Sequence, residues 1–284
     1  MALLFHIMNK VVLITGGACG IGRAIALELA KNKYDIVINY LTSKKAALSL
    51  EKEIVQTYRV RCMSICADVS DVEQVDQMVT KIEEELGGVD ILINNAAIDL
   101  SNLFHLKNAE EFRRTLDVNV VGAFNCSKRV YRYMLDQEYG RIINIASTNG
   151  INTYYPMCID YDASKAALIS VTHNLAFEFA PYIHVNCIAP GFIGTEHELD
   201  GYDEEFLKEE VEKIRKEAAA QEAEQTVQGT GEGENVENPG RAELDAKSVY
   251  DLYSRLNPLL AWSDDYYGEK DVLGEIEKTG NRKE

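Results

Sequence analysis

A tyrosine and a lysine four residues apart could carry out acid–base chemistry in this sequence. Tyr161 and Lys165, within YDASK, would lie one turn apart on the same face of an expected helix. A phenol titrates near pH 10, so exchanging a proton near neutrality needs a pKa shift of about three units, or about 4 kcal/mol of electrostatic bias. The neighbouring ammonium would supply part of that bias. The spacing alone is weak, because such pairs are frequent on ordinary helices.

A glycine-rich turn near the N-terminus could hold a phosphate-bearing ligand. The stretch Thr15–Gly22 (TGGACGIG) lies between an expected strand and an expected helix. Gly16, Gly20 and Gly22 permit a tight turn, close approach of the backbone to a pyrophosphate, and close packing of the helix on the strand. The free N–H groups of the helix N-terminus add positive potential. The alternative is an ordinary tight turn, but this context favours a dinucleotide cofactor.

The end of the second expected strand bears on which dinucleotide is bound. An NAD site would place Asp or Glu about twenty residues past the glycines, on the ribose 2′-hydroxyl. Asn39 and Tyr40 stand there instead, and Ser43, Lys44 and Lys45 follow. With no repelling carboxylate and two cations nearby, a 2′-phosphate would be tolerated, so NADPH is expected rather than NADH. The alternative is that both lysines are solvated helix residues.

Further polar residues follow other expected strands. Ser147 follows the fifth strand, the segment Asn94–Ala97 closes the fourth, and residues 190–195 follow the sixth. Asn119 lies within a long expected helix. Ligands bind beyond the carboxyl ends of the strands in an open parallel sheet, so these residues are expected near Tyr161.

Short β-branched runs alternate with longer helical patterns through the first 195 residues. The expected strands are Lys10–Thr15, Tyr34–Tyr40, Val60–Ala67, Asp90–Asn94, Arg141–Ala146 and His184–Ile188. The expected helices are Gly22–Asn32, Lys44–Tyr58, Val72–Leu86, Glu110–Gln137 and Asp160–Phe179. Nearly continuous apolar strands that alternate with helices indicate a parallel sheet covered on both faces. Right-handed crossovers then predict an α/β fold with a doubly wound sheet of six strands.

Composition excludes several classes of protein. The 284 residues are 46% hydrophobic and 26% charged, which excludes a wholly disordered chain. No apolar run approaches the roughly 18 residues of a membrane span, and Met1–Ile7 lacks the features of a secretory signal. The net charge of −17, concentrated after residue 195, argues against a nucleic-acid partner. Six cysteines without metal-ligand spacing predict no metal site, and reduced thiols fit a cytoplasmic location.

Taken in order, these motifs resemble those of the short-chain dehydrogenase/reductase family. The matching elements are TGxxxGxG, NNAA, an Asn, a Ser, YxxxK and a PG…T segment, and the resemblance covers residues 8–216. Within the family the chain is most similar to bacterial 3-oxoacyl-(acyl carrier protein) reductases, on VINYLTSKKAA, DVNVVGAFN, GRIINIAS and YDASKAAL. The resemblance implies a Rossmann-like fold and NADPH-dependent reduction of a 3-oxoacyl thioester in fatty-acid biosynthesis. Because the same segments recur in dehydrogenases of other secondary alcohols, a sugar or steroid substrate is an alternative.

The resemblance also implies a role for each matching residue. Tyr161 would protonate the carbonyl oxygen as a hydride arrives, and Lys165 would lower the pKa of the tyrosine and hold the nicotinamide ribose. Ser147 would hydrogen-bond the substrate oxygen, and Asn119 would anchor a water in a proton relay. Asp68 would receive the adenine, with a helix cap as its alternative role. The implied cofactor-binding residues are Thr15, Gly16, Gly20, Ile21, Gly22, Asn39, Tyr40, Ser43, Asp68, Val69, Asn95, Ala96, Tyr161, Lys165, Pro190, Gly191, Ile193 and Thr195.

The chain departs from the family pattern in two places. Ala97 replaces the glycine of the family's NNAG, which adds a methyl group near the cofactor. The family's last helix and seventh strand are not evident after residue 216. We therefore expect a reductase domain over residues 8–216, with a substrate lid from about residue 196. An atypical, partly helical, acidic extension is expected over residues 217–284, with a flexible linker at residues 228–240.

The resemblance also suggests binding partners, and the altered C-terminus suggests a non-catalytic alternative. An acyl carrier protein would meet a basic patch, for which the candidates are Arg113, Arg114, Lys128, Arg129 and Arg132. A solvated helix face is the alternative interpretation of these residues. A homodimer through the helices at residues 110–137 and 160–179 is expected, but not a tetramer, because the seventh strand contributes to that interface in the family. The other class is a cofactor-binding or interaction protein whose catalysis is impaired by the altered C-terminus.

Overall fold

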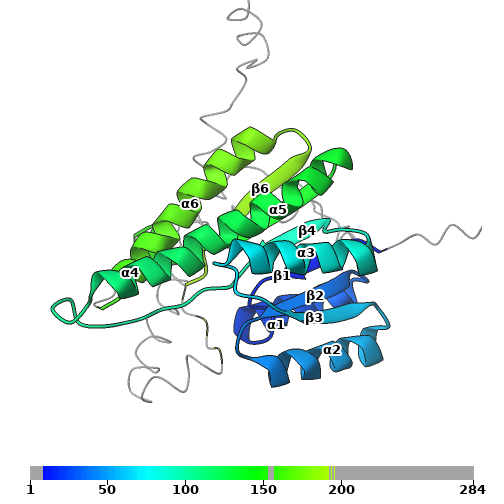
Figure 1. The fold of residues 1–284 in the computed structure, drawn as a ribbon, viewed down its shortest axis with the longest axis horizontal. Coiled ribbons are helices and arrows are strands. Elements are labelled where there is room, and N and C mark those ends of the chain that lie inside the picture. Colours follow the sequence, from blue (N-terminus) through cyan, green and yellow to red (C-terminus); the bar gives the residue numbers. More distant parts are fainter. Residues whose placement is uncertain (1–8, 153–156, 192, 194, 196–284) are drawn as a thin grey trace, which may run out of the picture. The chain divides into compact units, whose positions relative to one another are not determined.

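The structure is a computed structural model that describes residues 9–152, 157–191, 193 and 195. These residues belong to the first of two units into which the chain divides, Met1–Thr230 and Gly231–Glu284. The domain boundary expected at residues 216–217, the lid from residue 196 and the linker at residues 228–240 all lie outside the described residues. The described part consists of one sheet with helices on both faces (Figure 1).

All six strands of the sheet are parallel, in the order β3-β2-β1-β4-β5-β6. The strands are β1 (Val11–Ile14), β2 (Asp35–Tyr40), β3 (Cys62–Cys66), β4 (Ile91–Asn94), β5 (Gly140–Ile145) and β6 (Ile183–Ile188). The chain runs outward from β1 to β3, returns to the other side of β1 for β4, and runs outward again. The crevice beyond the carboxyl ends of β1 and β4 is therefore the place where this topology binds ligands. The predicted doubly wound sheet is confirmed, and within the described residues it ends at β6.

Six α-helices connect these strands in the described part of the chain. They are α1 (Gly20–Lys31), α2 (Lys44–Tyr58), α3 (Val72–Leu86), α4 (Ala109–Leu116), α5 (Gly122–Asp136) and α6 (Ile159–Phe179). Helices α3, α5 and α6 cover one face of the sheet, and α1 and α2 cover the other (Figure 1). None of the helices described is long and apolar enough to cross a membrane.

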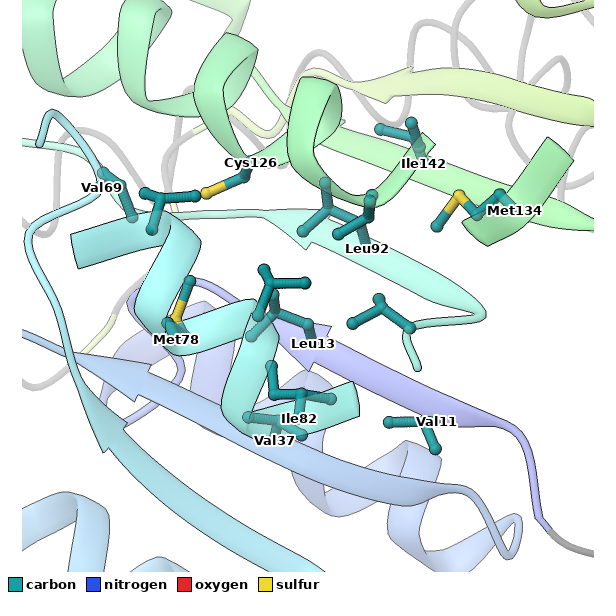
Figure 2. Close-up of a cluster of buried hydrophobic side chains, with 14 of the residues drawn as sticks. Val11, Leu13, Val37, Val69, Met78, Ile82, Leu92, Cys126, Met134 and Ile142 are labelled. Atoms are coloured by element: carbon teal, nitrogen blue, oxygen red, sulfur yellow. The ribbon is translucent and has the colours of Figure 1, made fainter. Parts of the chain in front are cut away.

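Alternate residues of a strand face opposite cores, as the pleat of a strand requires. Leu13 of β1 packs in one core with Met78 of α3 and Cys126 of α5, as Figure 2 shows. Its neighbour Ile14 packs in the other core with Leu50 of α2. Burial on both faces explains why the strands are apolar at nearly every position.

The long helix predicted at residues 110–137 is interrupted. A π-helical turn, η1 (Asp117–Val121), separates α4 from α5. Asn119 lies inside this turn and is 2% exposed. The prediction of one continuous helix is wrong here, because hydrogen bonds from Asn119 to a distant segment accompany the π turn, and local sequence carries no signal of them.

Candidate functional site

The glycine-rich turn leaves no room for side chains where β1 meets α1. Gly16 and Gly20 have φ angles of +60° and +51°, which L side chains rarely adopt. A Cβ on Gly16 would lie 2.9 Å from the Cα of Ala96, and a Cβ on Gly22 would lie 2.6 Å from the carbonyl oxygen of Gly16. Helix α1 begins within this stretch, at Gly20, and no side chain caps it. Ile21 in its first turn is half-buried. The turn is thus a backbone cradle of the kind that a pyrophosphate requires.

Hydrogen bonds join this cradle to the end of β4. The Thr15 hydroxyl accepts from the N–H groups of Asn95 (2.9 Å) and Ala96 (3.0 Å). The Asn95 amide donates to the carbonyl oxygens of Thr15 and Gly16, at 3.0 Å each. Because Thr15 is buried, these bonds fix the floor of the crevice between β1 and β4.

Of the residues predicted to bind the cofactor near the end of β2, some are buried and others are accessible to a ligand. The Asn39 side chain is buried: its amide donates to a backbone carbonyl after β3 (2.9 Å), and its Oδ1 accepts from the glycine-rich turn (3.3 Å). Tyr40 is buried as well. Ser43 is half-buried at the N-cap of α2, where its side chain makes no cap hydrogen bond, and Lys44 and Lys45 are exposed. Asn39 and Tyr40 therefore support the turn from within, while Ser43 and the lysines are accessible to a ligand.

Asp68, just after β3, is already held by other side chains. Its carboxylate accepts from the N–H and hydroxyl of Ser70 (2.9 and 2.6 Å) and from Arg114 (2.9 Å). Burial raises the pKa of Asp68, but these hydrogen bonds outweigh burial and hold the pKa below its ordinary value. The next residue, Val69, is buried. Asp71 caps α3, so the alternative that Asp68 is the helix cap is wrong.

Tyr161 and Lys165 lie one turn apart on α6. The Nζ of Lys165 lies 5.4 Å from the centre of the Tyr161 ring and donates to the carbonyl oxygen of Ile145, at the end of β5, at 2.7 Å. Lys165 is 3% exposed, and this burial lowers its pKa to about 8. An ammonium so close to a phenol favours the phenolate, which is what proton transfer at the tyrosine needs.

Ser147 follows β5 and is half-buried at the start of a short 3-10 turn, η2 (Thr148–Gly150). Its hydroxyl accepts from the N–H of Asn149 (3.2 Å). The Asn149 side chain donates to Asp162, the residue after Tyr161, at 2.7 Å. Asn149 therefore connects Ser147 to the helix of the tyrosine. It was missed from the sequence, where its only signal is its place in the loop that follows β5.

Asn119 is bonded to both the segment after β4 and the helix of the tyrosine. Its Oδ1 accepts from the N–H of Ile98 (2.8 Å), and its Nδ2 donates to the carbonyl oxygen of Ile98 (2.9 Å) and to the Ser164 hydroxyl (3.0 Å). Ser164 donates onward to the carbonyl oxygen of Tyr161 (2.7 Å). The alternative that Asn119 is an exposed helix residue is therefore wrong.

The segment after β6 lies near two parts of the site. The carbonyl oxygen of Pro190 accepts from the first N–H of η2 (3.0 Å). The methyl group of Thr195 lies 3.5 Å from the place that a Cβ on Gly20 would occupy, and its N–H donates to the carbonyl oxygen of Ile193 (2.7 Å). Gly191 and Ile193 are exposed. This segment thus runs from the loop of Ser147 to the phosphate cradle.

The predicted site residues therefore gather along the carboxyl edge of the sheet, from β3 to β6. Their roles toward a ligand stay predictions. Among the residues that the structure describes, no group of three or more His, Cys, Asp or Glu side chains could hold a metal ion.

Comparison with known proteins identifies close relatives of this arrangement. The short chain dehydrogenase family model matches residues 10–205. The chain is 40% identical over 187 residues to the 3-oxoacyl-(acyl-carrier-protein) reductase FabG of Staphylococcus epidermidis, which covers 66% of this chain and 76% of the relative. It is 37% identical over 204 residues to the acetoacetyl-CoA reductase of Paracoccus denitrificans, covering 71% and 81%. The crystal structure of an NAD⁺-bound xylitol dehydrogenase has a TM-score of 0.62 and 36% identity, over 66% of this chain and 72% of that one.

Proposed function

The chain belongs to the short-chain dehydrogenase family, and from that premise we propose that it reduces a 3-oxoacyl thioester to the 3-hydroxy compound with NADPH. The family membership makes it an oxidoreductase acting on CH–OH groups. The observation that carries the proposal is the buried Lys165, held by the end of β5 beside the ring of Tyr161. The relatives named as 3-oxoacyl and acetoacetyl-CoA reductases support the choice of substrate.

The residues of the crevice fit a dinucleotide. A Cβ at Gly16 or Gly22 would clash with the backbone that shapes the cradle, and the first N–H groups of α1 would bind the phosphates of the cofactor. When bound, the reduced nicotinamide supplies the hydride. The Tyr161 hydroxyl donates its proton to the substrate carbonyl oxygen as that oxygen gains charge, and the Ser147 hydroxyl donates a hydrogen bond to the same oxygen.

Lys165 sets the conditions for this proton transfer. Its ammonium stabilises the phenolate that remains when Tyr161 has given up its proton. Because its pKa is about 8, the lysine can itself pass a proton toward the tyrosine near neutral pH. Asn119, bonded through Ser164 to the same turn of α6, holds this turn and would anchor the water that returns the proton.

Preference for NADPH rests on the N-terminus of α2. The end of β2 carries no carboxylate to repel a 2′-phosphate, and Ser43, Lys44 and Lys45 begin the next helix. We expect Lys44→Ala with Lys45→Ala to raise the KM for NADPH by about tenfold, since two phosphate contacts are lost, and to leave the KM for NADH unchanged. Lys52→Ala, exposed further along α2, is the control. An equal effect on both cofactors would contradict the assignment.

An acyl carrier protein would meet a narrower basic patch than the sequence predicts. Arg114 is paired with Asp68, and Arg129 is paired with acidic residues of α3. Arg113, Lys128 and Arg132 are exposed. Lys128 lies over the ring of Phe124 (5.5 Å), on the helix expected in the dimer interface. We therefore propose Arg113 and Arg132 as the docking surface for an acidic carrier.

The remaining expectations extend the same proposal. We propose a cytoplasmic homodimer whose reductase domain spans residues 8–216, with residues 217–284 as a separate acidic extension. Oxidation of a sugar alcohol is the second candidate function, because the chain resembles a xylitol dehydrogenase of known structure. A protein that binds the cofactor without turnover is the third.

The three candidates are separated by two assays and a binding measurement. We expect NADPH-dependent reduction of acetoacetyl-CoA to be at least about tenfold faster than NAD⁺-dependent oxidation of xylitol, when each is measured as kcat/KM. The reverse order would contradict the thioester proposal and favour the sugar alcohol. Stabilisation by NADPH with no turnover of either substrate would favour the binding protein.

A further inference from the structure

A buried ion pair lies directly before Tyr161, among residues that the proposed mechanism does not use. Asp160 is 0% exposed, and its Oδ1 accepts from the Nζ of Lys107 at 2.8 Å. The Lys107 side chain is 5% exposed and also donates to the carbonyl oxygen of Leu100. The Thr115 hydroxyl donates to the other carboxylate oxygen at 2.7 Å. In every other ion pair of the described residues the basic side chain is at least 26% exposed.

Three elements meet at this carboxylate: the segment after β4, helix α4 and the start of α6. Further contacts attach the segment after β4 to the start of α6. The N–H of Asn102 donates to the carbonyl oxygen of Met157 (3.2 Å), and the Ser101 hydroxyl lies 3.3 Å from the Cys158 thiol. The turn that carries the tyrosine is therefore held from outside its own helix, and Asp160 makes the ion pair among these contacts.

Stability alone does not account for this pair. Removing two charges from water costs several kcal/mol, and apolar residues of similar volume often stabilise such a site as well or better. Burial raises the pKa of Asp160, but the hydrogen bonds from Lys107 and Thr115 outweigh burial and hold the pKa below its ordinary value. Asp160 therefore remains charged at neutral pH, one residue from a phenol whose ionisation matters.

We propose that Lys107 and Asp160 are positioning residues for Tyr161, which fix its turn of α6 and balance the charge within that turn. The inference rests on the proposed function, in which Tyr161 is the proton donor. Neither residue touches the reacting atoms. Asp160 anchors the turn through its charge, and Lys107 cancels that charge, so that Lys165 remains the dominant influence on the phenol.

Other ionisable groups lie on α6 or contact its residues within the described part of the chain. Lys165 and Asp162 lie on its own helix, and Cys158 precedes that helix. From the segment after β4, Asp99 contacts the Cys158 thiol at 3.6 Å. From β6, Cys187 interacts with Lys165. None of these groups is changed in the variants below, so they form a constant background.

The test compares two single variants with the double variant. Lys107→Met leaves an unpaired negative charge in the same turn of α6 as Tyr161, so the descending limb of the pH profile of kcat/KM for ketone reduction should move up by about half to one pH unit. Asp160→Asn leaves a buried positive charge, so the limb should move down by a similar amount. Lys107→Met with Asp160→Asn removes both charges and should return the limb to within about 0.2 units of wild type. Lys107→Gln replaces Lys107→Met if the latter does not fold.

A control and a second readout separate positioning from a merely structural role. Asp35→Asn breaks a half-buried pair with Arg61 at the opposite end of the sheet (2.6 Å), so it should lower the melting temperature and leave the pH profile unmoved. Tyrosine labelled with ¹³C reports the pKa of Tyr161 directly, with its signal assigned by its loss in Tyr161→Phe, whether or not the wild type turns over a ketone.

Opposite shifts that cancel in the double variant support the proposal. If both single variants lower activity or stability while the profile and the Tyr161 titration stay in place, or move in the same direction, the pair is structural and the proposal is wrong. Absence of wild-type turnover would count against the proposed function alone, because the NMR titration still decides the positioning role.

Discussion

At the residue scale, burial of the Lys165 ammonium lowers the stability of the folded protein but places a positive charge beside Tyr161. It is 3% exposed, and burial lowers its pKa from 10.5 to about 8. A charged ammonium in this place disfavours folding, because the unfolded chain solvates it better. The 2.5-unit difference in pKa corresponds to about 3 kcal/mol at pH values below 8, of which its hydrogen bond to Ile145 recovers about 1 kcal/mol.

We therefore predict that Lys165→Met stabilises the protein while it abolishes activity. At pH 7 the free energy of unfolding should rise by about 2 kcal/mol, and ketone reduction should fall at least about 100-fold. Between pH 8 and 10.5 the unfolded wild type binds more protons than the folded one, so wild-type stability rises with pH and the advantage of the variant shrinks. Denaturant unfolding at pH 7 and pH 10 measures this change, with Lys52→Met, at an exposed position of α2, as the control. If Lys165→Met raised the free energy of unfolding by the same amount at both pH values, the account would be contradicted.

Site residues that belong to local motifs are predictable from the sequence. Residues that are distant in the sequence and come into contact only in the folded chain are not. Tyr161 and Lys165 are one turn apart, so a helical period predicts their proximity. Lys107 and Asp160 are far apart in the sequence, and nothing in either neighbourhood indicates that the segment after β4 lies against α6. Asn39 shows the opposite case: its place at the end of β2 suggests contact with a ribose, whereas its amide is used inside the fold.

At the element scale, the junction of β1, α1 and the end of β4 depends on the absence of side chains. A Cβ on Gly22 would lie 2.6 Å from the carbonyl oxygen of Gly16 and 2.7 Å from the Asn95 amide. The backbone carbonyl cannot move without disturbing the cradle. The packing of α1 against the end of β4 and the shape of the phosphate cradle therefore both depend on Gly22.

We predict that Gly22→Ala removes the rise in melting temperature that NADPH gives to the wild type. The added methyl group pushes α1 away from the turn, so the N–H groups no longer converge on a pyrophosphate. Gly87→Ala is the matched control: its φ of +97° costs the variant about 1 kcal/mol, but open space surrounds it and it is remote from the cradle. Stabilisation by NADPH that is lost equally in both variants would show that general destabilisation, not the cradle, is responsible.

Element boundaries were predictable where local chemistry marks them. Helices α2 and α3 begin and end at the predicted residues. For α3 the local chemistry is clear, because Asp71 caps its first turn and Gly87, in a left-handed conformation, ends it. The prediction of one continuous helix over residues 110–137 is wrong at η1. This π turn carries Asn119, which is bonded to the backbone of Ile98, and such long-range bonds leave no periodic signature.

At the scale of the whole molecule, apolar side chains remain exposed on the helices where a dimer is expected. Val121 at the end of η1 and Phe124 in the first turn of α5 are 41% and 44% exposed, and Phe177 near the end of α6 is 68% exposed. Large exposed apolar side chains on a helix face are typical of an interface. A second copy of the chain would cover them.

We predict that Phe124→Glu converts a dimer into a monomer, because a charge would be buried at the interface without a partner. Sedimentation velocity at several concentrations measures the change. Leu48→Glu, at an equally exposed position on α2, should leave the dimer intact. A wild type that is monomeric at all concentrations, or a dimer that persists in Phe124→Glu, would contradict the expected interface.

The central claim is that Tyr161 donates the proton in NADPH-dependent reduction of a ketone, and one measurement tests it most directly. Steady-state oxidation of NADPH with acetoacetyl-CoA is compared between the wild type and Tyr161→Phe, with NADPH binding measured alongside. We predict turnover in the wild type and a loss of at least about 100-fold in kcat for the variant, with the affinity for NADPH retained. A variant that turns over as fast as the wild type would contradict the account.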